Sequence, residues 1–467
     1  MTVLHLVGVA LRLLAHKESV SSVAHAGIEG TINTATPEGV HFSSKYIKSA
    51  AHYVVNETFT TVLANFAEDL RQNNITIIRK YGQDAERDIE VALVSLSQLA
   101  NEIKSNEPFK PLVSNRSDVA LWNSFLNEQT KKDGTAVKWY SGTFLYTQCY
   151  LYRRVKQIFE LSKTLQNFDF CQKRKETSLI QSMGSCTLFA NYLIDKLSES
   201  NLTSEELGKE AIRLIKLSMW SNRFDMSITL GLATSSKDNP MELVDRLEEF
   251  IMVDDTEAVL KELIESKNRN TSIDFVNDNA GYELFADLCL ADFLLTSGFA
   301  CTIRFHVKAF SWYVSDTTTE DIVQTVDILS EMGSHSASLP ELSKRWKSYL
   351  DSGRWEIHTS DFWTLPHAYF VMPKIDPVLY RKLSQSSLLI FKGDLNYRKL
   401  MAGFHWPSTE GFTTALQGFQ PTSLVSLRTI KSDVICGLQP GQVESVSATN
   451  FAWNVCGDYG LVQYSGN

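Results

Sequence analysis

The sequence predicts an α/β protein, an α/β/α Rossmann-like sandwich with a mostly parallel sheet, preceded by an N-terminal helical region. Two observations lead to this class. Upstream of about residue 265, apolar side chains recur mainly at helical spacing. From about residue 271, short apolar runs rich in β-branched residues alternate with helical stretches. Such alternation is typical of parallel strands whose connecting helices cover both faces of the sheet.

The helical region rests on several amphipathic stretches. Residues 85–103, AERDIEVALVSLSQLANEI, place apolar side chains at helical spacing with charged residues between them. Residues 144–165 and 204–220 follow the same pattern. We therefore expect residues 41–265 to form a mostly helical region that packs on a catalytic core, whereas residues 1–40 form an N-terminal extension that is a candidate for poor order.

The α/β core is expected over residues 266–467. Its expected strands lie at 271–278, 300–310, 387–394 and 424–438. Its expected helices lie at 281–298 and 317–333, the second with threonine and acid at its start and glycine after its end. Residues 342–373 are aromatic-rich and contain prolines, and two interpretations stay open: a loop that lines a pocket, or an amphipathic connection.

Bulk composition limits the partners. The 467-residue chain has a formal net charge of −9 at pH 7 and no polybasic tract. Nucleic acid and anionic membranes favour a basic surface, so neither is expected as a partner. The seven cysteines are scattered without a Cys-x-x-Cys pair, which favours reduced thiols over a disulfide framework or a zinc ribbon. We therefore expect a reducing compartment, the cytoplasm, with the nucleus also open.

The N-terminal segment MTVLHLVGVALRLLAHK has the apolar character of a secretory signal. It lacks basic residues ahead of the apolar run, and His5 and Arg12 interrupt that run, so secretion is not expected. No later apolar run is long enough to span a bilayer.

Polar side chains follow the expected strands at the edge where parallel α/β sheets bind ligands. The residues concerned are Asp278 and Asn279, then Asp316, then Lys392, Gly393, Asp394 and Asn396, and finally Arg428, Thr429 and Lys431. Taken singly, each is also typical of a helix cap, a turn or a solvated strand end. Strand alternation places Thr429 and Lys431 on one face and Arg428 on the other.

The residue types at this edge are suited to one kind of chemistry. Asp278, Asn279 and Asp316 offer oxygen ligands, which suit Mg²⁺ or Mn²⁺ rather than zinc. Lysine and arginine suit phosphate. Carboxylates beside a phosphate repel it, and a divalent cation between them removes that repulsion. Gly281 leaves backbone N–H groups open to an anion at a helix start. The sequence therefore predicts a metal- and phosphate-binding core over residues 266–467.

Several motifs resemble one known family. VNDNAGYELFADLCLADFLL, WYVSDTT, FWTLPH, IFKGDLNYRKL, LRTIKSD, GLQPGQ and GDYGLVQY are similar to the damage-control phosphatase family, subfamily III, whose members are also described as acidic-residue (protein-glutamate) O-methyltransferases. The resemblance is close from about residue 271 to the C-terminus and weaker back to about residue 80. It implies an α/β/α sandwich and a metal-dependent phosphatase acting on fructose 1-phosphate and fructose 6-phosphate.

The resemblance also implies roles for particular residues. The metal, Mn²⁺ or alternatively Mg²⁺, Co²⁺ or Ni²⁺, would be held by Asp278, Asn279 and Asp316. These three residues and Asp394 would be catalytic. The implied substrate-binding residues are Asp278, Asn279, Asp394, Leu395, Asn396, Tyr397, Arg398 and Lys431. Under the methyltransferase description, Glu283 would contact S-adenosylmethionine.

The chain departs from the family pattern mainly upstream. Gln148 stands where a glutamate is expected, and Ser221 replaces a glycine, whereas Asn222 and Asp225 are kept. The family's early R-x-P segment is not evident, and residues 1–40 match no pattern. These departures bear on the helical region and on substrate preference more than on the metal site.

Three functions stay open from the sequence. The first is hydrolysis of a small-molecule sugar phosphate, with water or a carboxylate as the nucleophile. The second is methylation of glutamate by S-adenosylmethionine, against which stands the single Gly281 in place of a glycine-rich turn. The third is a non-enzymatic sugar-phosphate binder. The sequence leaves the oligomeric state open.

Overall fold

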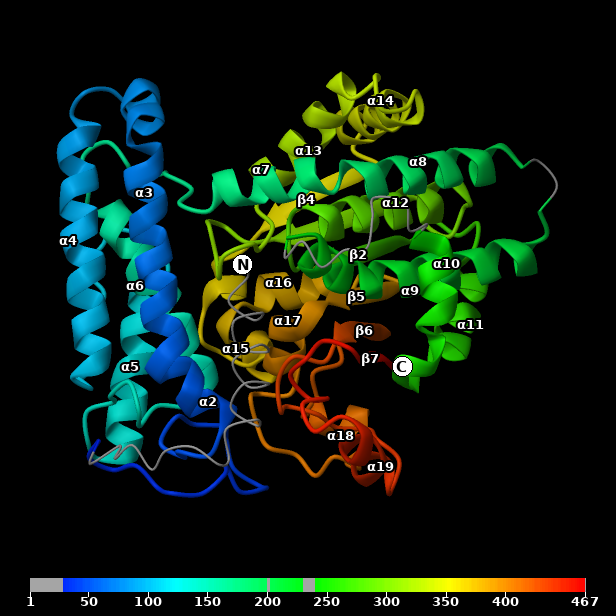
Figure 1. Ribbon diagram of the computed structural model, residues 1–467. Helices are drawn as coiled ribbons and strands as arrows, with labels where there is room; N and C mark the ends of the chain where they lie inside the picture. The colour runs from blue at the N-terminus through cyan, green and yellow to red at the C-terminus, as the bar shows by residue number, and fades with distance from the viewer. Residues whose placement is uncertain (1–27, 200–201, 230–239, 467) are drawn as a thin grey trace.

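A computed structural model describes residues 28–199, 202–229 and 240–466 (Figure 1). The apolar N-terminal stretch weighed above as a secretory signal lies outside the described residues. The helices expected at 85–103, 144–165 and 204–220 are present as α4 (Ala85–Lys104), α6 (Phe144–Glu160) and α9 (Ser204–Thr229).

The centre of the molecule is a seven-stranded sheet in the order β1-β7-β6-β5-β2-β3-β4. Neighbouring strands run parallel except β6 and β7, which are antiparallel. The strands are β1 (Ile251–Asp254), β2 (Ser272–Val276), β3 (Thr302–Val307), β4 (Trp355–Thr359), β5 (Leu388–Lys392), β6 (Leu424–Thr429) and β7 (Gly460–Ser465). The α/β class with a mostly parallel sheet is confirmed.

The sheet extends beyond the strands expected from the sequence. The stretch at 342–373, left open above, contains β4 as well as the end of helix α14 (Ser338–Asp351). β1 reaches back to residue 251, ahead of the boundary expected at 266. β6 ends at Thr429 and does not run to 438, because the Arg428 guanidinium donates to the carbonyl oxygens of Ser432 and Val434 and holds the chain in a turn.

One face of the sheet is covered by a thick helical layer. It contains α8 (Met183–Ser198), α9, α10 (Pro240–Arg246), α11 (Thr256–Ser266), α12 (Tyr282–Thr296), α13 (Thr319–Glu331) and α14. Helix α12 is buried on every side, as expected for a helix that is apolar around its whole circumference. Leu388 and Ile390 of β5 point into this layer, and the period of two along a strand sends Lys392 the same way.

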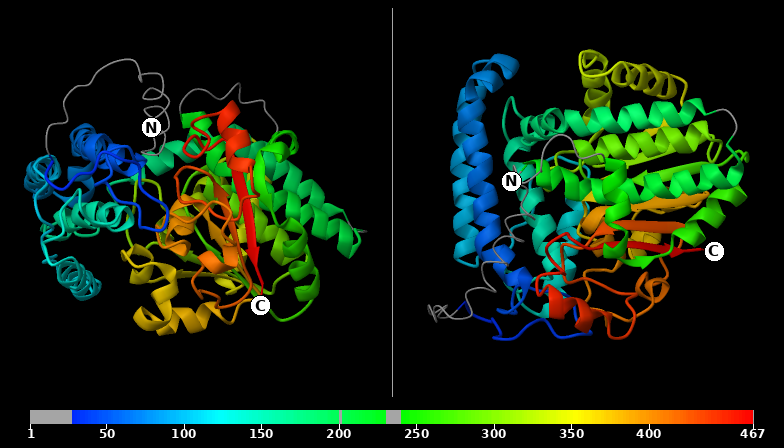
Figure 2. Two further views of the ribbon diagram at one scale, coloured as in Figure 1. Left: turned by 90° about the horizontal axis from the view of Figure 1, so that it is seen from below. Right: turned by 45° about the vertical axis from the view of Figure 1, so that its right-hand side comes forward.

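The second core joins the other face of the sheet to the N-terminal helices. Leu389 and Phe391 of β5 pack there with α17 (Gly393–Leu400), α18 (Phe412–Ala415), α16 (Pro377–Leu383) and α15 (Met372–Ile375). The same core contains α3 (Phe59–Tyr81), α4, α5 (Val119–Asp133) and α6. Figures 1 and 2 show α3 and α4 as a long pair beside the sandwich.

The helical region therefore lies against the carboxyl ends of the strands. Tyr152 of α6 stacks on Tyr313, and the α6 residue Cys149 contacts the Tyr313 hydroxyl; Tyr313 lies in the loop after β3. Helix α7 (Gln172–Gln181) continues from this region towards the sandwich, and α2 (Ala50–Tyr53) and α19 (Gln442–Thr449) complete the main helices.

Within residues 28–199, 202–229 and 240–466, no helix combines the length and apolar character needed to cross a bilayer. All seven cysteines lie within the described residues, no disulfide joins them, and five are buried.

Candidate functional site

The site residues named from the sequence gather at the carboxyl ends of four adjacent strands, β6, β5, β2 and β3. The chain leaves β2 towards β3 and β4 on one side, whereas β5 and β6 lie on the other. The point between β2 and β5 is thus a topological switch point, where open α/β sheets bind ligands. Asp278 follows β2, and Gly393 and Asp394 follow β5, on the two sides of this point.

Two loops pair there and bring the first acidic residues together. Asn279 and Asp316 form an antiparallel bridge. Around it, the Ala280 N–H donates to the Ser315 carbonyl (2.7 Å) and the Thr317 N–H donates to the Asp278 carbonyl (2.8 Å). Neither acid caps the helix that follows, because Gly281 is the N-cap of α12 and Thr318, in a capping box with Asp321, is that of α13.

Side-chain hydrogen bonds fix this pair of loops. The Asn279 Nδ2 donates to Asp278 Oδ2 (2.8 Å) and to Glu283 Oε2 (2.9 Å), and its Oδ1 accepts from the Ser315 hydroxyl (2.5 Å). Lys308, at the end of β3, lies with its Nζ 3.2 Å from Asp316 Oδ2 and donates to the Asn277 carbonyl. The carboxylates of Asp278, Asp316 and Glu283 are all buried.

Gly393 makes the close approach of β2 and β5 possible. Its φ of +82° is in the left-handed region, and a Cβ on this residue would overlap the Asp278 carboxylate. A glycine is therefore required here for two independent reasons, backbone conformation and space.

Burial raises the pKa of Asp278 well above its usual range, and the nearby carboxylates of Glu283 and Asp316 raise it further. Burial also raises the pKa of Asp316, although the ion pair with Lys308 opposes this. Asp278 and Asp316, with the Asn279 amide oxygen, form an oxygen donor set that fits a hard divalent cation. The amide oxygen keeps a second lone pair beside its bond to Ser315.

No group of three or more His, Cys, Asp and Glu side chains able to hold a metal ion is present in the described part of the chain. A metal at this edge would therefore depend on two carboxylates and one amide, which is the donor set expected from the sequence.

Glu283 lies next to Asn279, on the side of α9 and Lys392. Its Oε2 accepts from Asn222 of α9 (2.5 Å) as well as from Asn279, and its Oε1 is 3.4 Å from the Lys392 Nζ. Lys392 also lies 2.8 Å from Asp287 Oδ1 and donates to Ser218. Glu283 is therefore held by two amides and a buried ammonium group.

Asp394 is the centre of a second cluster. It accepts hydrogen bonds from Arg398 (2.8 Å), Arg428 (2.9 Å) and Ser432 (3.0 Å). Burial alone would raise its pKa, but the guanidinium groups of Arg428 and Arg398 lower the pKa of Asp394 to about 2. Arg398 donates its Nη1 to Gln148 Oε1 (2.6 Å). Two guanidinium groups thus share one carboxylate, and the cluster carries one net positive charge.

The other residues of the DLNYR stretch contact protein groups in this structure. Leu395 lies in the apolar core, and Tyr397 is buried beneath the Arg428 guanidinium. Asn396 donates to the carbonyl oxygens of Lys392 (2.8 Å) and Val276 (3.2 Å), which ties the ends of β5 and β2 together.

Lys431 follows β6 and is buried close to the Asp278 carboxylate, whose pKa it lowers. Its aliphatic chain lies against Gly457, where a Cβ would be 3.2 Å from Lys431 Cε. Lys431 thus lies near the acidic loops, that is, the loops that carry Asp278 and Asp316, whereas Arg428 pairs with Asp394 of α17.

Several residues of the site were not singled out from the sequence. Lys308 was missed although it directly follows β3, where the search at strand ends would have found it. Asp287 lies inside an apolar helix, so no local pattern marks it. Gln148 was named as a departure from the family pattern, but its contact with Arg398 could not be read from the sequence. Of the two kept upstream positions, Asn222 contacts Glu283, and the Asp225 side chain lies outside the described residues.

Comparisons with known proteins agree with the resemblance. A model of the damage-control phosphatase ARMT1-like domain matches residues 54–446. Proteins called Damage-control phosphatase ARMT1 are similar to this chain. The one from Danio rerio is 35% identical over 432 residues, covering 91% of this chain and 96% of the relative. That from Mus musculus is 35% identical over 434 residues, covering 91% and 98%.

The relative of the same name from Homo sapiens is 32% identical over 434 residues, covering 91% of this chain and 98% of its own. Among solved structures, a DUF89 family protein from Pyrococcus horikoshii is 14% identical, covers 77% of this chain and 94% of its own, and has a TM-score of 0.38, too low to support a conclusion. The domain match and the identity over most of the length show that this chain belongs to the ARMT1-like damage-control phosphatase family.

Proposed function

We propose that this protein is a metal-dependent phosphatase that hydrolyses sugar phosphates such as fructose 1-phosphate and fructose 6-phosphate. Family membership supports the coarser statement, a phosphatase of metabolite repair. The observation that carries the finer one is the gathering of two buried carboxylates, an amide and several cations at one switch point of the sheet.

In this proposal Asp278, Asn279 and Asp316 hold Mn²⁺, or alternatively Mg²⁺, Co²⁺ or Ni²⁺. The cation would supply charge neutralisation between the carboxylates and polarisation of a phosphoryl oxygen. Lys308 favours the ionised form of Asp316 and orients it, and Ser315 orients Asn279. The attacking nucleophile is water or a carboxylate.

The phosphate would be attracted by Lys431 and by the net positive cluster of Asp394, Arg398 and Arg428. Because the Asp394 pKa is about 2, this carboxylate stays ionised at neutral pH and is suited to positioning the two arginines. In the same proposal the partner is a small sugar phosphate, with no nucleic acid or membrane, and the protein acts in the cytoplasm or the nucleus.

The test is phosphate release from fructose 1-phosphate by chelator-treated protein, with and without added Mn²⁺. We expect release only with metal, and a loss of at least about a hundredfold in Asp278→Asn, which keeps the shape of the side chain but removes a metal-binding charge. Asp327→Asn is the control, because Asp327 pairs with Lys347 on the surface.

Metal-independent release, or unchanged activity of Asp278→Asn, would contradict the proposal. Two companion measurements, of sugar-phosphate binding and of methyl transfer, test the two other functions. Absence of turnover with retained sugar-phosphate binding would favour a non-enzymatic binder. Methyl transfer from S-adenosylmethionine, lost in Glu283→Gln, would favour the protein-glutamate methyltransferase. The Glu283 contacts to two amides and Lys392 give that function no specific support.

A further inference from the structure

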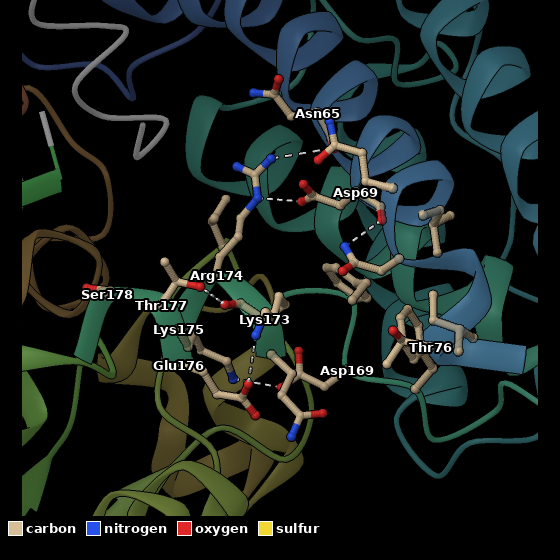
Figure 3. A pocket seen from close by; sticks show the side chains of 18 of the residues that line it. Asn65, Asp69, Thr76, Asp169, Lys173, Arg174, Lys175, Glu176, Thr177 and Ser178 are labelled. Atoms are coloured by element: carbon tan, nitrogen blue, oxygen red, sulfur yellow. Dashed lines mark hydrogen bonds and ion pairs between the residues drawn. The ribbon is translucent and has the colours of Figure 1, made fainter. Parts of the chain in front are cut away.

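A cavity of about 900 Å³ separates α3 from α7 (Figure 3). One wall is α3, from Thr61 to Tyr81, and the opposite wall is α7 with Phe168, Asp169 and Phe170 before it. The remaining lining residues are Ala280, Val314 and Ser315. These three belong to the paired loops that carry Asn279 and Asp316, so the cavity ends on the candidate metal site.

The floor of this cleft is also where the site meets solvent. Asn279 and Ser315 are partly exposed and are joined by a hydrogen bond of 2.5 Å. In contrast, the carboxylates on either side, Asp278 and Asp316, belong to residues only 6% and 3% exposed. Ser315 lines the cleft, and its hydrogen bond places Asn279 beside the cleft floor.

The charged groups that line the cleft are largely paired with one another. Arg174 of α7 reaches across to Asp69 of α3, as Figure 3 shows. Lys175 is held between Asp169 (2.7 Å) and Asp321 (2.6 Å). An ionic group of a ligand at Arg174 or Lys175 would have to break these pairs, which favours an uncharged group at that place.

The rest of the lining suits a polar, uncharged group. Amide side chains come from both walls, including Asn65, Asn73 and Gln181. Amides and hydroxyls provide donors and acceptors together, as sugar hydroxyl groups require. Tyr81 and Phe168, in edge contact at 5.9 Å, add an apolar surface for a sugar ring.

The cleft volume lies near the upper end of the range of about 300–1,000 Å³ found for small-molecule sites. We propose that the α3–α7 cleft is a second sugar subsite, so that the protein accepts a monophosphorylated oligosaccharide with its phosphate at Asp278 and Asn279 and its further sugar ring in the cleft. This inference rests on the proposed phosphatase function and adds the size class of the substrate.

The test compares fructose 6-phosphate with sucrose phosphorylated at C6 of its fructose unit, because the second compound carries one additional ring on the same phosphorylated unit. Asn73 lines the cleft and Asn74, its neighbour on α3, is exposed and does not line it. Asn73→Trp and Asn74→Trp are therefore matched variants that differ in which side of the helix receives the added volume.

With wild-type protein and Mn²⁺, we expect kcat/KM for the sucrose phosphate to equal or exceed that for fructose 6-phosphate. Asn73→Trp should lower the value for the sucrose phosphate by about tenfold or more and change that for fructose 6-phosphate by less than about twofold. Asn74→Trp should change neither. A sucrose phosphate that is a tenfold poorer substrate of the wild type, or equal losses for both substrates in Asn73→Trp, would overturn the inference.

If wild-type protein releases phosphate from neither compound, the proposed function fails. Calorimetric measurement of the binding of both compounds then still tests whether the cleft is a sugar subsite. Tighter binding of the sucrose phosphate than of fructose 6-phosphate, lost in Asn73→Trp alone, supports the subsite. Equal binding of both compounds, or equal effects of the two variants, overturns it.

Discussion

At the scale of single residues, the site depends on two features that have no charge of their own. Gly393 leaves space for the Asp278 carboxylate, and the neutral Gln148 amide accepts a hydrogen bond from Arg398. A glutamate at 148 would neutralise the cluster of Asp394, Arg398 and Arg428, whereas glutamine leaves it positive. The position of the Asp278 carboxylate and the net charge around Arg398 therefore depend on uncharged neighbours, one of which leaves space while the other adds no charge.

Gly393→Ala should remove the site. The new methyl group would overlap the Asp278 carboxylate, and an alanine with φ near +82° costs a further about 1–2 kcal/mol. We expect phosphatase activity to fall by at least about a hundredfold, measured as kcat/KM for fructose 1-phosphate. Gly418→Ala is the matched control, because Gly418 has a φ of +84° with nothing within 4 Å of the added Cβ. Equal losses in both variants would show that backbone strain alone is responsible.

Asp394 should contribute stability that depends on pH. Burial raises and Arg428 and Arg398 lower its pKa, to about 2 in the folded protein against 3.8 ordinarily. A depressed folded pKa gives stability that is present above pH 4 and is lost as pH falls from about 4 towards 2, amounting to about 2 kcal/mol. Urea unfolding at pH 5 and pH 2.5 checks this. The stability advantage of wild type over Asp394→Asn should narrow at the lower pH, and a constant difference would argue against the assignment.

At the scale of elements, buried ion pairs connect helices to strand ends. Lys392 at the end of β5 meets Ser218 of α9 and Asp287 of α12, and its direction follows from the strand alternation that also buries Leu388 and Ile390. Lys175 of α7 meets Asp321, which caps α13 just after the Asp316 loop. Ion pairs and hydrogen bonds from α7, α9 and α12 thus hold the strand ends and loops of the site in place, while apolar packing holds the helices against the sheet.

Lys392→Met should destabilise the protein strongly. It leaves the buried Asp287 without its cation; burial has already raised the pKa of Asp287 to about 6 despite the opposing effect of Lys392. Removing one partner of a buried pair costs about 3–5 kcal/mol, which urea unfolding at pH 7 would measure. Lys347→Met is the control, since Lys347 and Asp327 pair at the surface and the loss should stay below about 1 kcal/mol. Similar losses for the two variants would contradict a central role of the Lys392 network.

At the scale of the whole molecule, the helical region and the sandwich share one apolar core, and the acidic loops lie between them. Burial and neighbouring carboxylates disfavour the ionised forms of Asp278 and Asp316, and a bound cation would offset this cost. A metal that binds here only in the folded state should therefore raise the free energy of unfolding of the whole chain.

Saturating Mn²⁺ should therefore raise the melting temperature of wild-type protein, measured by scanning calorimetry after chelator treatment. A metal present at about a hundred times its Kd adds about 2.7 kcal/mol to the free energy of unfolding. Asp278→Asn should melt higher than wild type without metal and show no shift with it. An equal Mn²⁺ shift in the variant would place the metal elsewhere.

The sequence by itself determined the class of fold, the main helices and which strand ends carry acids, amides and cations, because helical and strand periodicity and strand-end chemistry are local properties. It did not reveal β1, β4 or β7 as strands. The edge strands β1 and β4 are short and have mixed burial, so they carry little periodic pattern. Gly393 was named from the sequence among the strand-end residues, but without a reason for a glycine there; the reason is the Asp278 carboxylate, which a Cβ at 393 would overlap.

Only the tertiary structure decided which charges meet. Lys308 with Asp316, Gln148 with Arg398 and Lys392 with Asp287 join segments that are 8, 250 and 105 positions apart. These contacts depend on how the loop after β3 folds back, on how α6 packs against α17, and on how α12 packs against the end of β5, respectively. The α3–α7 cleft also depends on the tertiary structure, because its walls and floor come from four separate parts of the chain.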